Sequence, residues 1–213
     1  YYQEKGASAV SVLTDTPSFG GGFDDLQLAA NTLEGTGILV LQKDFVIDPI
    51  QIYLARKHGA NMILLIAAIL SPKEMQSLKQ IAESLNMGVL AEVHSLEEYA
   101  KLEAINFPVV GVNNRNLGNF KTAINCCNYI ANNINHQGFL IAESGIATAL
   151  DLRITQQNAD GFLIGTSLMR STKQLNFSEL TKPKYFFKAC GIRTQELLST
   201  DTPDLIGINF SPI

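Results

Sequence analysis

The sequence predicts an α/β fold in which a parallel sheet closes into a (β/α)8 barrel. Short apolar runs alternate with amphipathic segments along the chain, which is the pattern of βα units. The runs are apolar at nearly every position, as expected for strands buried on both faces. Polar residues stand at the carboxyl end of strand after strand. A barrel brings these ends together at one mouth, whereas the competing architecture, an open doubly wound sheet, spreads them along an edge.

Seven segments have the length and composition of buried strands. They are Ala7–Leu13, Gly37–Leu41, Met62–Ile66, Gly88–Glu92, Val109–Val112, Phe139–Ala142 and Gly161–Ile164. A closed barrel of this class needs eight strands. We therefore expect a barrel that lacks one strand.

The segments between these strands place apolar residues at helical spacing, as Ile50, Tyr53 and Leu54 do. The expected helices are Asp48–Lys57, Pro72–Ser84, Leu96–Leu102, Cys127–Ile134 and Ala147–Thr155. The densest apolar run, Met62–Leu70, is shorter than the roughly 18 to 20 residues of a membrane span. It is therefore interpreted as a core strand.

The pattern changes after Arg170, where a polar stretch runs to a break at Pro183. A strand, a short helix and another strand then begin afresh, at Tyr185–Ala189, Thr194–Leu198 and Leu205–Phe210. We expect a domain boundary near residues 178–184. This gives a first barrel over 1–180 and the beginning of a second over 184–213.

Composition excludes several classes of protein. Of 213 residues, 46% are hydrophobic and 17% charged, which is a globular and not a disordered balance. The net charge of −4 argues against nucleic acid or an anionic membrane as partner. The three cysteines, Cys126, Cys127 and Cys190, lack metal-ligand spacing, so no zinc site is expected. Their number and the lack of a visible signal peptide favour a cytoplasmic location.

Lys43 and Glu92 are the candidate catalytic residues. A lysine in a barrel mouth can act as a general acid or pair with a phosphate, although a solvated strand-end lysine is an equal alternative. Glu92 closes an apolar run, where a charge is costly unless it is paired or used. Burial there can raise the pKa of a carboxyl group and fit it for acid or base catalysis. His94 is expected to be a loop residue.

Further candidates follow the later strands. Asn113 can orient a hydroxyl or carbonyl, and Arg115 can clamp a carboxylate, although the Asn-Asn pair also suits a turn. The Glu-Ser-Gly at 143–145 and the Gly-Thr-Ser at 165–167 each lead into a helix. Such paired helix starts can bind phosphate, and plain turns are the alternative.

Three consecutive glycines, 20–22, stand between Phe19 and Phe23. This run matches neither a P-loop nor the GxGxxG fingerprint. We expect a flexible loop that either folds an aromatic ring over a ligand or is simply mobile.

Six stretches in order resemble indole-3-glycerol-phosphate synthases of tryptophan biosynthesis. They are SVLT at 11–14, KDFVID at 43–48, EVH at 92–94, GVNNRNL at 111–117, ESGI at 143–146 and LIGTSLM at 163–169. Together they span about four-fifths of the chain. The resemblance implies a carboxy-lyase that closes the indole ring of 1-(2-carboxyphenylamino)-1-deoxyribulose 5-phosphate, with no cofactor or metal.

The resemblance also implies roles for individual residues. Lys43 matches the general acid, Glu92 the second acid/base group and Asn113 a positioning residue. The other matches are substrate-binding residues, namely Phe19, Phe45, Arg115, Glu143 and Ser144, and phosphate-binding residues, namely Gly145, Gly165 and Thr166. Thr166 stands where a serine is frequent.

Near its end the chain resembles a second family. FKACGIR at 187–193 and DLIGINF at 204–210 are similar to the opening of phosphoribosylanthranilate isomerases, with Ala189 as a departure. Cys190 matches the general base of that family, although on its own it would be interpreted as a buried structural cysteine. Synthase followed by isomerase is the order of a bifunctional enzyme.

We therefore expect an internal piece of that fusion, one that begins at Tyr1 without a methionine. The resemblance implies that the family's first strand, with its Glu-x-Lys-x-x-Ser-Pro-Ser motif, precedes Tyr1. We therefore expect a barrel that lacks its first strand, so the piece alone should fold poorly or be inactive. The expected partner is the small phosphorylated anthranilate-derived substrate, and the fusion should be monomeric.

Two rival functions remain. A barrel isomerase of the histidine-biosynthesis kind would need paired aspartates, and Glu92 stands at one of those positions. A catalytically inactive barrel, kept as a binding or structural module, is the second. The intact set of Lys43, Glu92 and Asn113 argues against it.

Overall fold

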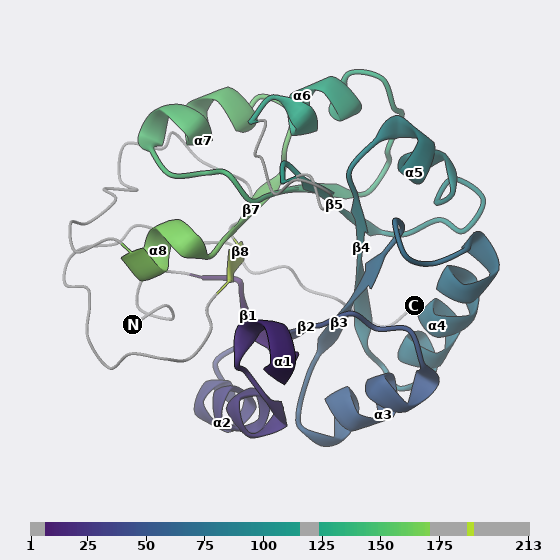
Figure 1. Cartoon of the computed structure of the whole chain (residues 1–213), viewed down its shortest axis with the longest axis vertical. Coiled ribbons are helices and arrows are strands. Elements are labelled where there is room, and N and C mark those ends of the chain that lie inside the picture. Colours follow the sequence, from purple (N-terminus) through teal and green to yellow (C-terminus); the bar gives the residue numbers. More distant parts are fainter. Residues whose placement is uncertain (1–6, 116–123, 171–186, 190–213) are drawn as a thin grey trace.

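The strands form a ring at the centre of the molecule, and helices surround it (Figure 1). This computed structural model describes residues 7–115, 124–170 and 187–189 of the chain. All neighbouring strands are parallel, and the sheet closes into a barrel in the order β1 to β8. The predicted TIM-barrel-like α/β fold is confirmed.

Seven of the strands are those predicted from the sequence, with their ends moved by a few residues at most. They are β1 Ala9–Leu13, β2 Leu39–Lys43, β3 Met62–Ile66, β4 Gly88–Val93, β5 Val109–Asn113, β6 Phe139–Glu143 and β7 Gly161–Ile164. Three strands extend past their predicted carboxyl ends, so Lys43, Asn113 and Glu143 are the last residues of β2, β5 and β6.

The eighth strand corrects the prediction of a ring that lacks one strand. β8, Phe187–Ala189, pairs with β1 on one side and with β7 on the other. We expected this segment to open a second barrel. The physical reason is that β1 and β7 would otherwise expose unpaired backbone N–H and C=O groups, which a parallel strand satisfies. The remainder of the proposed second barrel lies outside the described residues.

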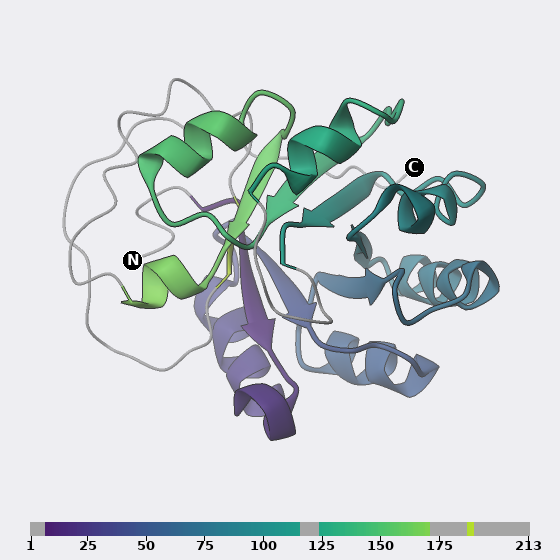
Figure 2. The same ribbon diagram turned by 45° about the horizontal axis from the view of Figure 1, so that its top comes forward.

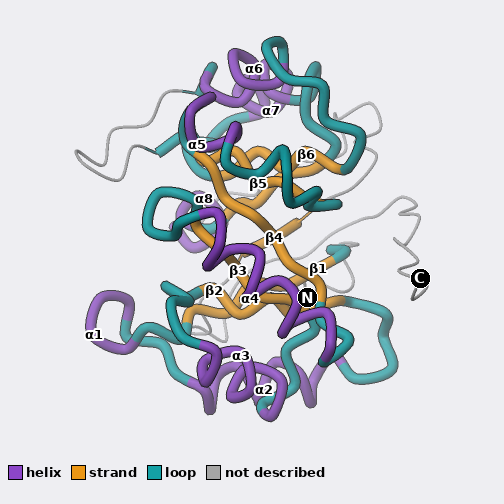
Figure 3. The backbone as a smooth tube through the Cα atoms, turned by 90° about the vertical axis from the view of Figure 1, so that its right-hand side faces the viewer, coloured by secondary structure: helices purple, strands orange, loops and turns teal. Residues whose placement is uncertain are grey.

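Alternate residues of each strand face two separate cores. The inner core fills the barrel with side chains such as Leu41, Leu64 and Leu90. The outer core lies between the sheet and the helices and includes Val40, Leu65 and many others. Figures 2 and 3 show the helices packed around the outside of the strands. Because side chains alternate along a strand, Lys43 has the inward direction of Leu41, and Glu92 that of Leu90.

Eight helices are described in this part of the chain, and several have clear sequence caps. Ser71 Oγ accepts a hydrogen bond from Glu74 N, and the Glu74 carboxylate accepts one from Ser71 N. This capping box begins α4 where the sequence predicts it. The bounds are α1 Thr16–Phe19, α2 Phe23–Leu33, α3 Pro49–Lys57, α4 Pro72–Ser84, α5 Leu96–Ala100, α6 Cys126–Ala131, α7 Ala149–Thr155 and α8 Thr166–Arg170.

The glycine run connects α1 to α2. Gly20 ends α1 with a left-handed φ of 68°, and a side chain at Gly21 would overlap the Leu13 carbonyl. Gly22 N donates to Asp25 Oδ2 at 3.0 Å and begins α2. Gly20 and Gly21 thus allow a left-handed conformation and a close approach, and the expectation that this run is flexible stays a prediction.

Within the described ranges, no helix is both long and apolar enough to cross a membrane.

Candidate active site

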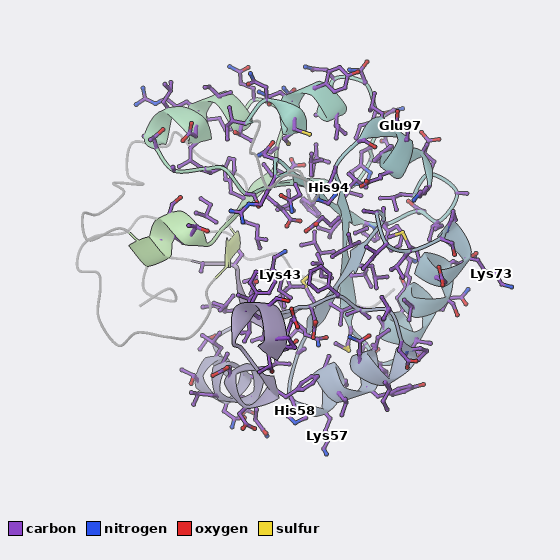
Figure 4. The ribbon with its side chains drawn as sticks, viewed as in Figure 1. Lys43, Lys57, His58, Lys73, His94 and Glu97 are labelled. Carbon is purple, nitrogen blue, oxygen red and sulfur yellow. The ribbon has the colours of Figure 1, made fainter. Side chains whose placement is uncertain are left out.

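Four side chains from four strands meet in the mouth of the barrel. Lys43 comes from β2, Glu92 from β4, Asn113 from β5 and Glu143 from β6. Lys43 Nζ lies 3.3 Å from Glu92 Oε2 and 3.5 Å from Glu143 Oε2. In Figure 4 Lys43 lies toward the centre of the ring, whereas Lys57 and Lys73 lie at its periphery. The structure thus brings together four residues predicted separately from strand ends.

The Lys43 ammonium is the exposed member of this cluster. Its side chain is 24% exposed, and those of both glutamates are almost fully buried. Burial disfavours the charged amine, but the two carboxyl groups outweigh it and raise the pKa of Lys43 above its usual value. At neutral pH Lys43 is therefore a protonated donor that a molecule in the mouth can reach.

The two carboxyl groups have opposite protonation states. Burial and the charge of Glu92 raise the pKa of Glu143 to about 8. Burial also opposes ionisation of Glu92, but Lys43 and His94 outweigh it and hold its pKa below the usual value. The sequence-based expectation that burial raises the pKa of Glu92 is therefore wrong, and the effect falls on Glu143 instead. One acid and one base thus lie beside the same lysine.

Gly111 makes this arrangement possible. It lies on β5, paired with Glu92 of β4 and Ile141 of β6. A Cβ at this position would overlap Glu143 Oε1. The Glu143 carboxyl group therefore occupies the space that a side chain at Gly111 would fill. Sequence reasoning did not single out Gly111, because a glycine in a strand by itself indicates only a bulge or close approach.

Asn113 is buried next to this cluster, and Arg115 follows it. A hydrogen bond from the Asn113 side chain favours the ionised form of Glu92. Asn113 Oδ1 accepts a hydrogen bond from Arg115 N at 2.9 Å. Arg115 Nε is buried and has no hydrogen bond to any described residue. Contact of Arg115 with a substrate carboxylate stays a prediction.

Asn114 braces the mouth and was missed by sequence reasoning. Its backbone N–H donates to Glu143 O at 2.8 Å, and its side chain donates to Ser144 O at 3.1 Å. Its Oδ1 accepts from Cys127 N at 3.1 Å. Asn114 thereby joins the ends of β5 and β6 to α6. The Asn-Asn pair could have indicated this, had the second asparagine been assigned to a buried position.

The loops after β6 and β7 are linked to one another. Ser144 has a φ of 63°, an uncommon conformation for a residue with a side chain, and Gly145 follows with 75°. Ser167 Oγ donates to Ile146 O at 2.6 Å and so ties α8 to this loop. Gly165 is half-buried and Thr166 exposed. Phosphate binding by these loops remains a prediction.

Phe19 follows β1 and Phe45 follows β2, which are neighbouring strands of the barrel. Phe19 ends α1 and is 54% exposed, and Phe45 follows β2 and is 40% exposed. Phe45 N donates to Asp44 Oδ1 at 2.8 Å. Thr14 donates to Asp44 Oδ2 at 2.6 Å, and the buried Gln42 amide donates to Thr14 at 3.0 Å. This network, which sequence reasoning did not identify, fixes the segment on both sides of Lys43.

The model of the family described as indole-3-glycerol phosphate synthase matches residues 1–180 of the chain. The chain belongs to the indole-3-glycerol phosphate synthase family. Curated indole-3-glycerol phosphate synthases of two Staphylococcus aureus strains are each 45% identical to it over 170 residues. These alignments cover 79% of this chain and 64% of each relative. The chain thus spans somewhat less than two thirds of the length of these relatives.

Solved structures confirm the barrel fold. The 3-hexulose-6-phosphate synthase of Salmonella typhimurium is 12% identical with a TM-score of 0.63, covering 76% of this chain and 79% of that one. The 3-keto-L-gulonate-6-phosphate decarboxylase of Vibrio cholerae is 12% identical with a TM-score of 0.56, covering 86% and 76%. At this identity the likeness concerns the fold alone.

The remaining sequence predictions concern Cys190, metal binding and His94. Cys190 lies outside the described residues, so its role stays a prediction. In residues 7–115, 124–170 and 187–189, no group of three or more His, Cys, Asp and Glu side chains could hold a metal ion. His94 lies in the loop between β4 and α5, as expected, and its Nε2 is 3.4 Å from Glu92 Oε1.

Proposed function

We propose that this barrel catalyses indole-ring closure. It converts 1-(2-carboxyphenylamino)-1-deoxyribulose 5-phosphate to indole-3-glycerol phosphate, carbon dioxide and water. Membership of the synthase family supports the reaction class. The observation that carries it is the Lys43 ammonium between Glu92 and Glu143 at the open end of the barrel.

The first step is an attack of the anilino ring carbon on the substrate ketone. A new carbon–carbon bond forms, and the ketone oxygen must gain a proton as its double bond breaks. Lys43 supplies that proton, since its raised pKa keeps it protonated and it is the exposed member of the cluster. The ring carbon then loses carbon dioxide, and the bonding electrons return to the ring.

The second step is the loss of the new hydroxyl group as water. A proton leaves the ring system and another joins the departing hydroxyl, which restores an aromatic indole. Glu92 accepts and returns a proton here, because it is ionised and buried beside Lys43. Glu143 is buried and protonated at neutral pH, so its one O–H donates to the Glu92 carboxylate and it adds no second negative charge near the substrate carboxylate.

Binding roles complete the proposal. Asn113 positions Glu92, Arg115 and Ser144 hold the polar end of the substrate, and the exposed rings of Phe19 and Phe45 enclose its anilino ring. The linked loops after β6 and β7 bind the phosphate through Gly145, Gly165 and Thr166. The substrate is then the small-molecule partner, and the reaction needs no cofactor because its aromatic product and the released carbon dioxide drive it. We further propose a cytoplasmic location.

We also propose that an isomerase barrel follows this one, with the first domain over 1–180 and the second beginning at 184. It would convert N-(5-phosphoribosyl)anthranilate to the synthase's substrate, with Cys190 as general base. The resemblance of residues 187–193 and 204–210 supports this. In this structure β8 pairs with β1 and β7 of the first barrel. In the fusion, Phe187–Ala189 would leave these two strands and pair within the isomerase barrel instead. We propose that such a fusion is monomeric.

The test adds the carboxyphenylamino-deoxyribulose phosphate to the purified protein, from a reading frame extended in both directions, and follows indole fluorescence. The sequence given contains no tryptophan, so it adds no indole background. We expect a rise that disappears in Lys43→Ala and persists in Lys73→Ala, an exposed lysine at the periphery. A flat trace from the folded protein would instead support the alternative, an inactive phosphate-binding barrel that serves as a binding module.

A further inference from the structure

His94 lies against the carboxylate that the proposed reaction uses as a base. Its Nε2 is 3.4 Å from Glu92 Oε1, the oxygen that does not face Lys43. The other imidazole nitrogen, Nδ1, is 3.2 Å from Glu98 Oε2. The His94 side chain is only 11% exposed, and Figure 4 shows it toward the inside of the ring, whereas Glu97 lies outside.

The backbone of His94 is also fixed on two sides. Its N–H donates to Glu98 Oε2 at 2.8 Å, and Cys126 Sγ of α6 donates to its carbonyl oxygen at 3.6 Å. The imidazole therefore has a defined position between the end of β4 and the first turn of α5.

Both imidazole nitrogens face carboxylate oxygens, which can only accept hydrogen bonds when ionised. Burial opposes ionisation of Glu98, but hydrogen bonds from His94 outweigh it and lower its pKa. An imidazole with a hydrogen on each nitrogen presents an N–H to both carboxylates. An imidazole with one hydrogen would turn a lone pair toward one of them. Nε2 is buried and has no hydrogen bond of good geometry to a described residue, so its interaction with Glu92 is mainly electrostatic.

We propose that His94, held by Glu98, is a positioning residue that orients the Glu92 carboxylate and keeps it ionised. Lys43 fixes one oxygen of that carboxylate and His94 the other. The inference rests on the proposed function for the reaction that Glu92 serves, and on the geometry for the contact itself. His94 acts through Glu92 and transfers no proton to the substrate.

The charged groups around this pair are few in the described part of the chain. Glu92 faces Lys43 of β2 and Glu143 of β6 in addition to His94. His94 faces Glu92 and Glu98, with the Cys126 thiol at its carbonyl, and Lys101 acts on Glu98. Among them, only His94 opposes Lys43 across the Glu92 carboxylate.

Two conservative substitutions separate the two contacts of His94. In His94→Gln the amide nitrogen lies near the former Nε2 and keeps an N–H beside Glu92. In His94→Asn the amide nitrogen lies near the former Nδ1 and can donate only to Glu98. A residue that merely held the loop through Glu98 would tolerate asparagine better. The proposal requires the opposite order.

The first measurement is a pH titration of Glu92 by NMR of carboxyl-labelled glutamate, assigned from the resonance absent in Glu92→Gln. We expect the midpoint to move up by about one pH unit in His94→Asn and by less in His94→Gln. His58→Asn, at the end of α3 and away from the mouth, is the matched control and should leave it unchanged. An unchanged midpoint in folded His94→Asn overturns the proposal, whether or not the enzyme is active.

The second measurement is steady-state kinetics of ring closure. We expect kcat to fall about 10- to 100-fold in His94→Asn, less than the loss of a whole acid/base group, with KM little changed. His94→Gln should recover most of this loss. Equal losses in the two variants, or a greater loss in His94→Gln, would overturn the proposal. A shifted titration in a protein without any ring-closing activity would support the contact and refute the proposed function.

Discussion

The Glu143 carboxyl group lies in the space that a side chain at Gly111 would occupy. The two residues belong to neighbouring strands, β5 and β6, and both face the inside of the barrel. Because Gly111 lacks a side chain, Glu143 can approach Lys43 to 3.5 Å from a fully buried position. The lack of a side chain at Gly111 thus lets Glu143, whose pKa is raised, lie beside the protonated Lys43 amine.

Gly111→Ala should therefore disrupt the cluster while leaving the barrel folded. The added methyl overlaps Glu143 Oε1, so that carboxyl group must move away from Lys43. We expect a stability loss of about 1–3 kcal/mol and a fall in ring-closing activity of about 100-fold. Urea unfolding and the fluorescence assay measure the two effects.

Gly22→Ala is the control for this substitution, since a Cβ there meets no atom within 4 Å and its φ is extended. Full activity in folded Gly111→Ala would show that the position of Glu143 is unimportant.

Glu143 should make the folded protein less stable as the pH rises from about 4.5 to about 8. Its pKa is raised to about 8 in the folded state, mainly by burial and then by Glu92, against 4.5 in the unfolded chain. In that window the folded state binds the extra proton, so a rise in pH favours unfolding. The raised pKa of Lys43 affects stability only near pH 10.5 and above, and the lowered pKa of Glu92 only below about 4.5.

Glu143→Gln removes this dependence because glutamine resembles the protonated acid. Relative to wild type, the variant should gain about 1 kcal/mol or more between pH 5 and pH 8. Urea unfolding at the two pH values measures the difference. Glu34→Gln, at an exposed position, should follow wild type at both values. If wild type and Glu143→Gln change in parallel with pH, Glu143 does not carry a raised pKa.

Asn114→Ala should loosen the mouth without touching the Lys43 cluster. It leaves the Ser144 carbonyl and the Cys127 N–H without the partners described above. Two lost buried hydrogen bonds predict a destabilisation of about 2–3 kcal/mol, measured by chemical unfolding. Asn133→Ala, which removes one exposed hydrogen bond to Tyr129, should cost less than about 1 kcal/mol. Equal effects in the two variants would contradict a bracing role for Asn114.

The sequence predicted the seven main strands because each is an apolar run that packs against both cores. It also predicted that Lys43, Glu92 and Asn113 converge, since parallel strands place their carboxyl ends at one mouth. It missed α2, which follows the glycine run, and it missed Asn114 and Gly111. Their roles depend on contacts between different strands, which local periodicity does not contain.

The pairing of β8 and the protonation states were beyond sequence reasoning for a related reason. Phe187–Ala189 looks like a strand from its composition, but its neighbours are decided by which sheet edges are free. In the same way, Glu92 and Glu143 both stand at or near the carboxyl ends of apolar strands. Only their distances to Lys43, His94 and one another decide which of them ionises.

Thr14 should influence catalysis through the segment that carries Lys43. Its hydroxyl donates to Asp44 at 2.6 Å and accepts from Gln42 at 3.0 Å, so it contacts the residues on both sides of Lys43. Thr14→Val keeps the shape but removes both hydrogen bonds, which leaves the buried Gln42 amide with a longer contact of 3.3 Å to Asp44. We expect a destabilisation of about 1–3 kcal/mol and a fall in kcat of about tenfold.

Thr32→Val is the matched control, because the Thr32 hydroxyl bonds only to Leu28 O on the exposed side of α2. It should change kcat by less than about twofold. Thermal unfolding monitored alongside the fluorescence assay separates the two effects of Thr14→Val. If kcat falls only at temperatures where the variant begins to unfold, Thr14 stabilises the barrel without positioning Lys43. A lower kcat well below the unfolding transition would show that the polar network behind β2 holds the ammonium in place.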